Sequence, residues 1–123
     1  MGFEEKIVTI ISIWGPVVVW AGIIFWFSSW TTLPGSSVFV WDFALKKTAH
    51  MGMYAGLIYW IQRALHWKTD KRYWLMAGLL TVLYAISDEY HQTLVPGRTG
   101  LPMDVGFDSL GAYLGYLKIK NLL

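Results

Sequence analysis

One group of residues with acid–base chemistry lies in the segment SDEYHQ. Asp88, His91 and Gln92 stand at positions i, i+3 and i+4, which lie on one face of a helix, and Glu89 is next to them. An imidazole that is oriented by a carboxylate is suited to general acid–base catalysis. The same side chains could instead form a structural network of salt bridges with Lys47 and Arg98.

A second group lies earlier in the chain. Lys47, His50 and Tyr54 stand at i, i+3 and i+7, again on one helical face. Lys47 and His50 could bind an anion or act as an acid–base pair, or else Lys47 extends to the membrane surface and His50 bridges helices. Arg98, in the turn VPGRTG, could bind a phosphate or carboxylate, or pair with an acidic residue of the chain. The catalytic candidates of both groups are His50, Asp88, Glu89 and His91.

A third group combines acids with glycines. Asp104, Asp108, Gly111 and Gly115 stand at i, i+4, i+7 and i+11, so they form one stripe along a helix. The two glycines form a GxxxG pattern, which allows another backbone to approach closely and makes an oligomer through them possible. Two carboxylates on one stripe disfavour joint ionisation, so a base or water must compensate for them.

The two histidines and the carboxylates could also converge on a metal ion. However, the chain has no HExxH motif and no cysteine, and its other ligand spacings are not those of known metal motifs. The sequence therefore predicts no metal ligand and no cofactor.

Composition indicates what must position these residues. The chain has 123 residues, of which 55% are hydrophobic and only 15% are charged. This excludes a disordered chain, the lack of cysteine excludes a disulfide framework, and a net charge of +2 argues against a nucleic-acid-binding protein. We therefore predict a single domain, residues 1–123, that is integral to the membrane.

Hydrophobic runs predict an all-α fold, an integral membrane bundle of four transmembrane helices. The spans are expected at about 7–28, 43–62, 73–94 and 103–117. Pro16 lies inside the first span and should kink or break it. Four spans place both termini and the 63–72 loop on one side, together with seven of the ten basic residues. The positive-inside rule therefore predicts cytoplasmic termini in a multi-pass protein.

This orientation brings the polar residues together at the outward end of the bundle. We expect them to form a hydrated polar pocket, because charged side chains inside a membrane persist when they are paired, solvated or functional. The candidate ligand-binding residues are Lys47, His50, Tyr54, Asp88, Glu89, Gln92, Arg98, Asp104 and Asp108.

The strings DFALKKTAHMGMYAGL, SDEYHQTLVPGRTG and MDVGFDSLGAYLG, in this order, resemble the VanZ-like family over roughly residues 14–117. The resemblance implies a small bacterial cell-membrane protein linked to low-level resistance to teicoplanin-type glycopeptides. It places an amide where this chain has Asp108. It therefore implies that Asp108→Asn is tolerated. Asp104→Asn should instead impair function, because it removes the carboxylate nearest the Arg98 turn.

Three functions are compatible with these residues. The first is a cell-envelope protein whose pocket binds a membrane lipid head group, a lipid-linked cell-wall precursor or the glycopeptide. The second is a membrane enzyme that acts on such a lipid through His50 or His91. The third is a structural bundle that assembles with a membrane partner.

Overall fold

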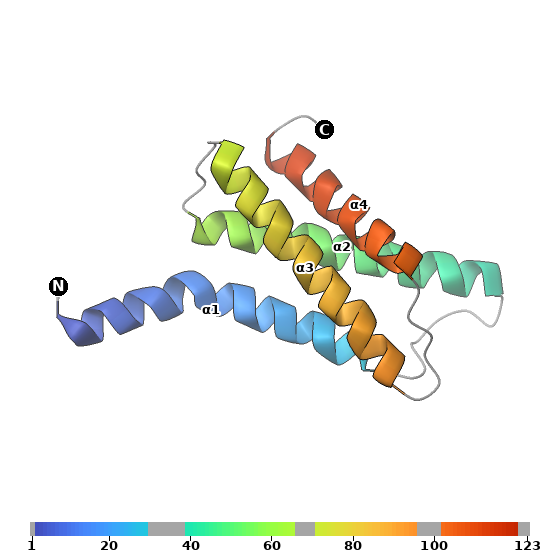
Figure 1. The fold of residues 1–123 in the computed structure, drawn as a ribbon, viewed down its shortest axis with the longest axis horizontal. Coiled ribbons are helices and arrows are strands. Elements are labelled where there is room, and N and C mark those ends of the chain that lie inside the picture. Colours follow the sequence, from blue (N-terminus) through green and yellow to red (C-terminus); the bar gives the residue numbers. More distant parts are fainter. Residues whose placement is uncertain (1, 30–38, 66–70, 96–101, 121–123) are drawn as a thin grey trace.

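The computed structural model describes residues 2–29, 39–65, 71–95 and 102–120, with side chains except at 39–46, 71, 102 and 103 (Figure 1). These residues form four α-helices and contain no strand. The helices are α1 (Phe3–Ser28), α2 (Phe39–Ala64), α3 (Lys71–Leu94) and α4 (Pro102–Ile119). Each helix contains one of the four predicted hydrophobic segments, and the all-α prediction is confirmed for the described residues.

Helix α1 is the most apolar element. Glu4 and Glu5 lie in its first turn, where carboxylates complement the helix dipole, and Glu5 Oε2 accepts a hydrogen bond of 2.8 Å from the Gly2 N–H. Pro16 does not break α1, which is one continuous helix, although its axis is bent (Figure 1). A proline removes one backbone hydrogen bond, so a bend without a break is a usual outcome.

Among the described residues, α1 is the only helix that is both long enough and apolar enough to cross a membrane by itself. The other three helices contain too many polar or charged residues to be identified as membrane-spanning by length and mean hydropathy. The shortest of them, α4, has 18 residues and three charged side chains, Asp104, Asp108 and Lys118. By length and hydropathy, the prediction of four membrane-spanning helices is therefore not confirmed for the described residues.

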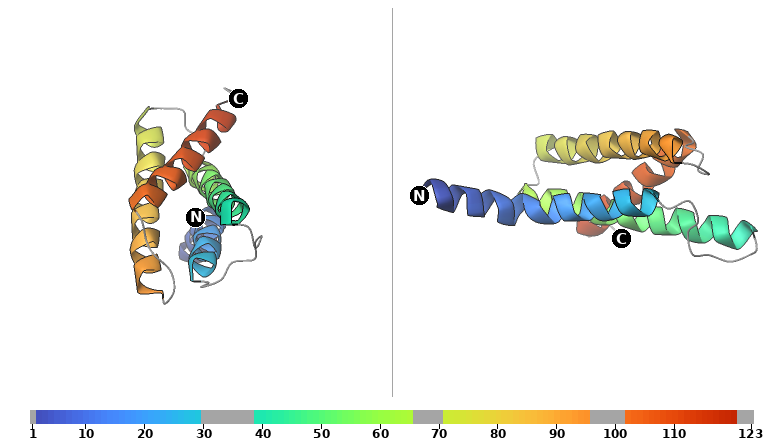
Figure 2. Two further views of the ribbon diagram at one scale, coloured as in Figure 1. Left: turned by 90° about the vertical axis from the view of Figure 1, so that its right-hand side faces the viewer. Right: turned by 90° about the horizontal axis from the view of Figure 1, so that it is seen from below.

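Helix α2 lies at the centre of the fold. It contacts all three other helices, and α1 and α4 lie on opposite sides of it without contact between their described residues (Figures 1 and 2). A core of apolar side chains fills the space between the helices. It includes Ile24, Tyr54, Leu57, Ile58, Ile61, Ala77, Ala85 and Ala112.

Glycines of α4 allow its close approach to α2. A Cβ atom built on Gly111 would lie 2.3 Å from the Met51 carbonyl oxygen, and one on Gly115 would lie 2.9 Å from the Ala55 Cα. The GxxxG stripe is therefore occupied by a helix of the same chain. An oligomer through these glycines would have to displace α2.

Helix α1 is held against the opposite side of α2 by a tryptophan. The Trp20 indole lies where a side chain on Gly56 would be, and its Nε1 donates a hydrogen bond of 2.7 Å to the Met53 carbonyl. A second link joins α1 to α3, because the Tyr84 hydroxyl donates to the Ala21 carbonyl. Aromatic side chains with one polar atom thus replace charge pairs at these helix contacts.

One face of α3 exposes a row of large apolar side chains. Leu75, Leu79, Leu83 and Ile86 follow one another on this face, and each exposes about half of its surface or more. The polar side chains Asp88 and Gln92 of the same helix are buried instead, each 2% exposed. Helix α3 thus has apolar residues outside and acidic or amide residues inside.

The helix ends are arranged as the polar clustering requires. The ends of α1 and α3 and the beginnings of α2 and α4 lie at the same side of the molecule, on the right in Figure 1. This is the end at which the sequence places its convergent polar residues.

Candidate functional site

Side chains of α2, α3 and α4 meet in a polar cluster that we define by seven residues. Their spacing along each helix places them on the faces that point into the bundle. The tight contact of α4 with α2 then brings the polar side chains of these two helices close together. The polar cluster consists of Lys47, His50, Tyr54, Asp88, Gln92, Asp104 and Asp108.

Lys47 and Asp104 form the ion pair at the more exposed part of the polar cluster. The Lys47 Nζ donates to Asp104 Oδ1, and the side chains are 21% and 10% exposed. The ammonium group also lies 5.6 Å from the centre of the Phe107 ring, within the range of a cation–π interaction. Phe107 was not among the predicted site residues, because nothing in its spacing connects it with Lys47 on another helix.

His50 and Asp108 form a second contact between the same two helices. The His50 Nδ1 lies 3.4 Å from Asp108 Oδ1, where the side chains are 12% and 1% exposed. This distance is longer than the usual N–H···O hydrogen bond of about 2.9 Å. A carboxylate in this position can still orient the imidazole for proton transfer.

Asp88 connects α3 to this pair. Its Oδ2 accepts hydrogen bonds of 3.2 Å from the Tyr54 hydroxyl and 3.2 Å from the Gln92 Nε2. Its Oδ1 is buried and has no hydrogen-bond partner, and the same holds for Asp108 Oδ2. The interior of the polar cluster therefore contains two carboxylate oxygens that no donor satisfies.

Three of these residues have the chemistry and proximity of metal ligands. One ligand atom each from His50, Asp88 and Asp108 lies within 4.8 Å of the other two. They come from three different helices, so no short sequence motif connects them. The predicted absence of a metal rested on the lack of short motifs, which do not detect ligands that lie on separate helices.

His91 does not join the polar cluster as its spacing suggests. Its Nε2 is 2.9 Å from the Oγ of Ser29, the residue that follows α1, and its ring stacks on Phe25 of α1 with centroids 4.0 Å apart. Helix α1 lies beside α3 at this point, so His91 contacts α1, whereas Asp88 and Gln92 face the interior. Ser29 was missed, although the common location of the ends of α1 and α3 could have indicated it.

Two further predicted site residues, Glu89 and Arg98, lie outside the seven residues of the polar cluster. Glu89 is buried, at 6% exposed, one position from Asp88. Arg98 lies outside the described residues, and so does the contact that was predicted for it with an acidic residue or a ligand.

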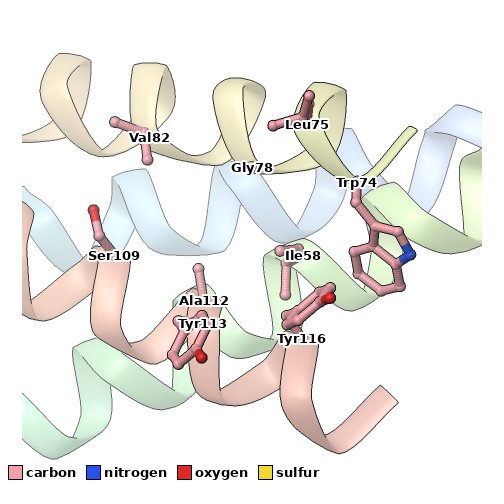
Figure 3. A pocket seen from close by; sticks show the side chains of 9 residues that line it. All are labelled: Ile58, Trp74, Leu75, Gly78, Val82, Ser109, Ala112, Tyr113 and Tyr116. Carbon is pink, nitrogen blue, oxygen red and sulfur yellow. The ribbon is translucent and has the colours of Figure 1, made fainter. Parts of the chain in front are cut away.

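The cavity in Figure 3 lies away from the polar cluster. It has a volume of about 400 Å³ and opens between α3 and α4, with Leu75 and Val82 on one wall and Ala112 and Tyr113 on the other. Its lining is mostly apolar and includes none of the predicted site residues. This cavity is therefore not the expected hydrated pocket.

Comparison with known proteins gives the family. The family model described as VanZ/LLP1 matches residues 12–123, nearly the whole chain. The chain belongs to the VanZ-like family. At the family level, it is a VanZ-type, resistance-related membrane protein, and the apolar helix α1 agrees with this class. Neither the search of curated proteins nor that of solved structures gave a match.

Proposed function

We propose that this VanZ-like protein is a multi-pass protein of the bacterial cell membrane whose polar cluster faces outward and binds an envelope ligand. The ligand would be a lipid head group, a lipid-linked cell-wall precursor or a teicoplanin-type glycopeptide. The observation that carries the proposal is the Lys47–Asp104 pair, a partly exposed ion pair at the entrance to an otherwise buried set of acids.

The distribution of polarity supports four membrane crossings. Apolar side chains cover the outside of α3, while the acids and amides of α3 and α4 are buried between helices. Within a membrane this arrangement hides the charges that keep α2, α3 and α4 from being apolar overall. The concentration of lysine and arginine near the termini and the 63–72 loop supports cytoplasmic termini.

The chemistry of the pair suggests how such a ligand is bound. Lys47 offers an ammonium group to a phosphate or carboxylate, and Asp104 offers a carboxylate to an amine. A head group that carries both charges could replace the internal ion pair by two intermolecular ones. Cell-envelope lipids and glycopeptides contain such groups, whereas a purely apolar ligand would gain nothing from this pair.

A cysteine reporter at position 69 tests the orientation. We expect Thr69→Cys, in the loop outside the described residues, to react with a membrane-impermeant maleimide only after the cells are opened. The chain has no native cysteine, so each reporter is the sole reactive thiol. Ser36→Cys, in the first connection, is the matched reporter for the outer side. Labelling of Thr69→Cys in intact cells would contradict cytoplasmic termini.

Two aspartate variants test the role of the pair. We expect Asp104→Asn to weaken ligand binding on the order of tenfold, because it removes the carboxylate that would pair with the amine of the ligand. Asp108→Asn keeps an oxygen acceptor towards His50 and should leave ligand binding within about twofold of the wild type. The measurements are lipid or glycopeptide binding to the purified protein and the teicoplanin susceptibility of cells that express each variant. Equal effects of the two substitutions would show that the wrong aspartate has been assigned.

An enzymatic function is the second candidate, and the His50–Asp108 contact favours it. A carboxylate 3.4 Å from the imidazole could orient His50 as a general base, with Lys47 beside the substrate anion. Turnover of a purified lipid that His50→Gln abolishes would separate this candidate from binding alone.

A further inference from the structure

The His50–Asp108 distance fits metal ligands better than a hydrogen bond. Two ligands of a tetrahedral zinc ion, each with a bond of about 2.0–2.1 Å, are about 3.3 Å apart. The His50 Nδ1 and Asp108 Oδ1 are 3.4 Å apart, and Asp88 offers a third ligand atom within 4.8 Å of both. Three side chains from three helices thus place one ligand atom each within 4.8 Å of the other two.

The unsatisfied oxygens give independent evidence for a missing cation. Asp88 and Asp108 are 2% and 1% exposed, and each has one buried carboxylate oxygen without a hydrogen-bond partner. Burial of a carboxylate oxygen without a partner is costly. A divalent cation bound by the two carboxylates would compensate both buried charges.

The neighbours of Asp88 are arranged as second-shell groups of a metal site. Tyr54 and Gln92 both donate to Oδ2, which fixes the carboxylate and leaves Oδ1 available as a ligand. Tyr54 is completely buried, so its hydroxyl has a fixed position. Ligands in metalloproteins are commonly oriented by such hydrogen bonds.

We propose that His50, Asp88 and Asp108 bind one divalent transition-metal ion, with zinc as the best fit. An imidazole nitrogen with two carboxylates suits zinc, whereas magnesium and calcium prefer oxygen ligands alone. Three protein ligands leave a coordination position for water or for an oxygen of a ligand. The inference goes beyond the proposed function, since ligand binding at Lys47 and Asp104 does not require the ion.

Metal titration of the purified full-length chain in detergent tests the site. After treatment with a chelator, the protein is titrated calorimetrically with Zn²⁺, Mn²⁺, Mg²⁺ and Ca²⁺, and bound metal is measured by mass spectrometry. We expect one Zn²⁺ per chain and a zinc-dependent rise in the melting temperature, with no comparable effect of Mg²⁺ or Ca²⁺. A folded wild-type chain that binds no Zn²⁺ at micromolar concentration would overturn the proposal.

Variants locate the ion. His50→Gln, Asp88→Asn and Asp108→Asn should each weaken Zn²⁺ binding by at least about 100-fold, and Tyr54→Phe by about 10–100-fold, because it removes a second-shell hydrogen bond. His91→Gln is the matched histidine control and should bind Zn²⁺ like the wild type. Circular dichroism checks that each variant is folded. If a variant of a ligand does not fold, Tyr54→Phe still tests the site, because it retains all three ligands. Unchanged binding in His50→Gln and Asp108→Asn would overturn the site. Lipid or glycopeptide binding is also measured on the wild-type protein with and without Zn²⁺, and equal binding in the two states would separate the metal site from the proposed function.

Discussion

Replacing Gly111 with alanine is expected to separate α4 from α2 and to cost about 3 kcal/mol of stability, or to prevent accumulation of the folded protein. The added Cβ would lie 2.3 Å from the Met51 carbonyl oxygen and 2.5 Å from its Cα. Both atoms belong to the backbone of a helix, so no side-chain rotation can relieve the overlap. Overpacking costs typically about 1–3 kcal/mol, and a rigid neighbour places this site at the upper end.

A second glycine on α4 provides the control. Nothing lies within 4 Å of a Cβ built on Gly106, so Gly106→Ala should be neutral or stabilise the helix by up to about 1 kcal/mol. Unfolding of both variants can be followed by circular dichroism in detergent during heating. Equal stability of Gly111→Ala and Gly106→Ala would contradict the close contact of α4 with α2.

Replacing Asp88 with leucine is expected to destabilise the fold by about 2–4 kcal/mol. The substitution removes the acceptor of the Tyr54 hydroxyl, which is completely buried, and of one Gln92 hydrogen bond. A buried donor that loses its acceptor costs about 1–3 kcal/mol. The aspartate is thus needed for the fold whether or not it also binds an ion.

Asp88→Asn separates the loss of the acceptor from the loss of charge. The asparagine oxygen can still accept from Tyr54, so we expect a loss of less than about 1 kcal/mol in this variant. Urea titration of both variants in detergent, with tryptophan fluorescence as the readout, would compare them. If leucine were as stable as asparagine, the Tyr54–Asp88–Gln92 contacts would have no stabilising role.

Much of the candidate site can be derived from local patterns. The hydrophobic runs predict each helix, and the i, i+3, i+4 spacings predict that Asp88 and Gln92 share a face, as they do. The GxxxG spacing predicts a close helix contact at Gly111 and Gly115, and both glycines make one. The motif strings also indicate the VanZ-like family, which the family match over residues 12–123 confirms.

The sequence by itself determined the helices, their polar faces and the end of the molecule where these faces meet, because helical period and hydrophobicity are local properties. Only the tertiary structure decided the pairing: Asp104 with Lys47, Asp108 with His50, and His91 with Ser29 at the end of α1. The sequence spacing gives the face on which a side chain lies, but not the rotation of each helix or the neighbour that it meets. Those depend on close contacts between helices, above all that of α4 with α2, and these contacts place His50, Asp88 and Asp108 around one point.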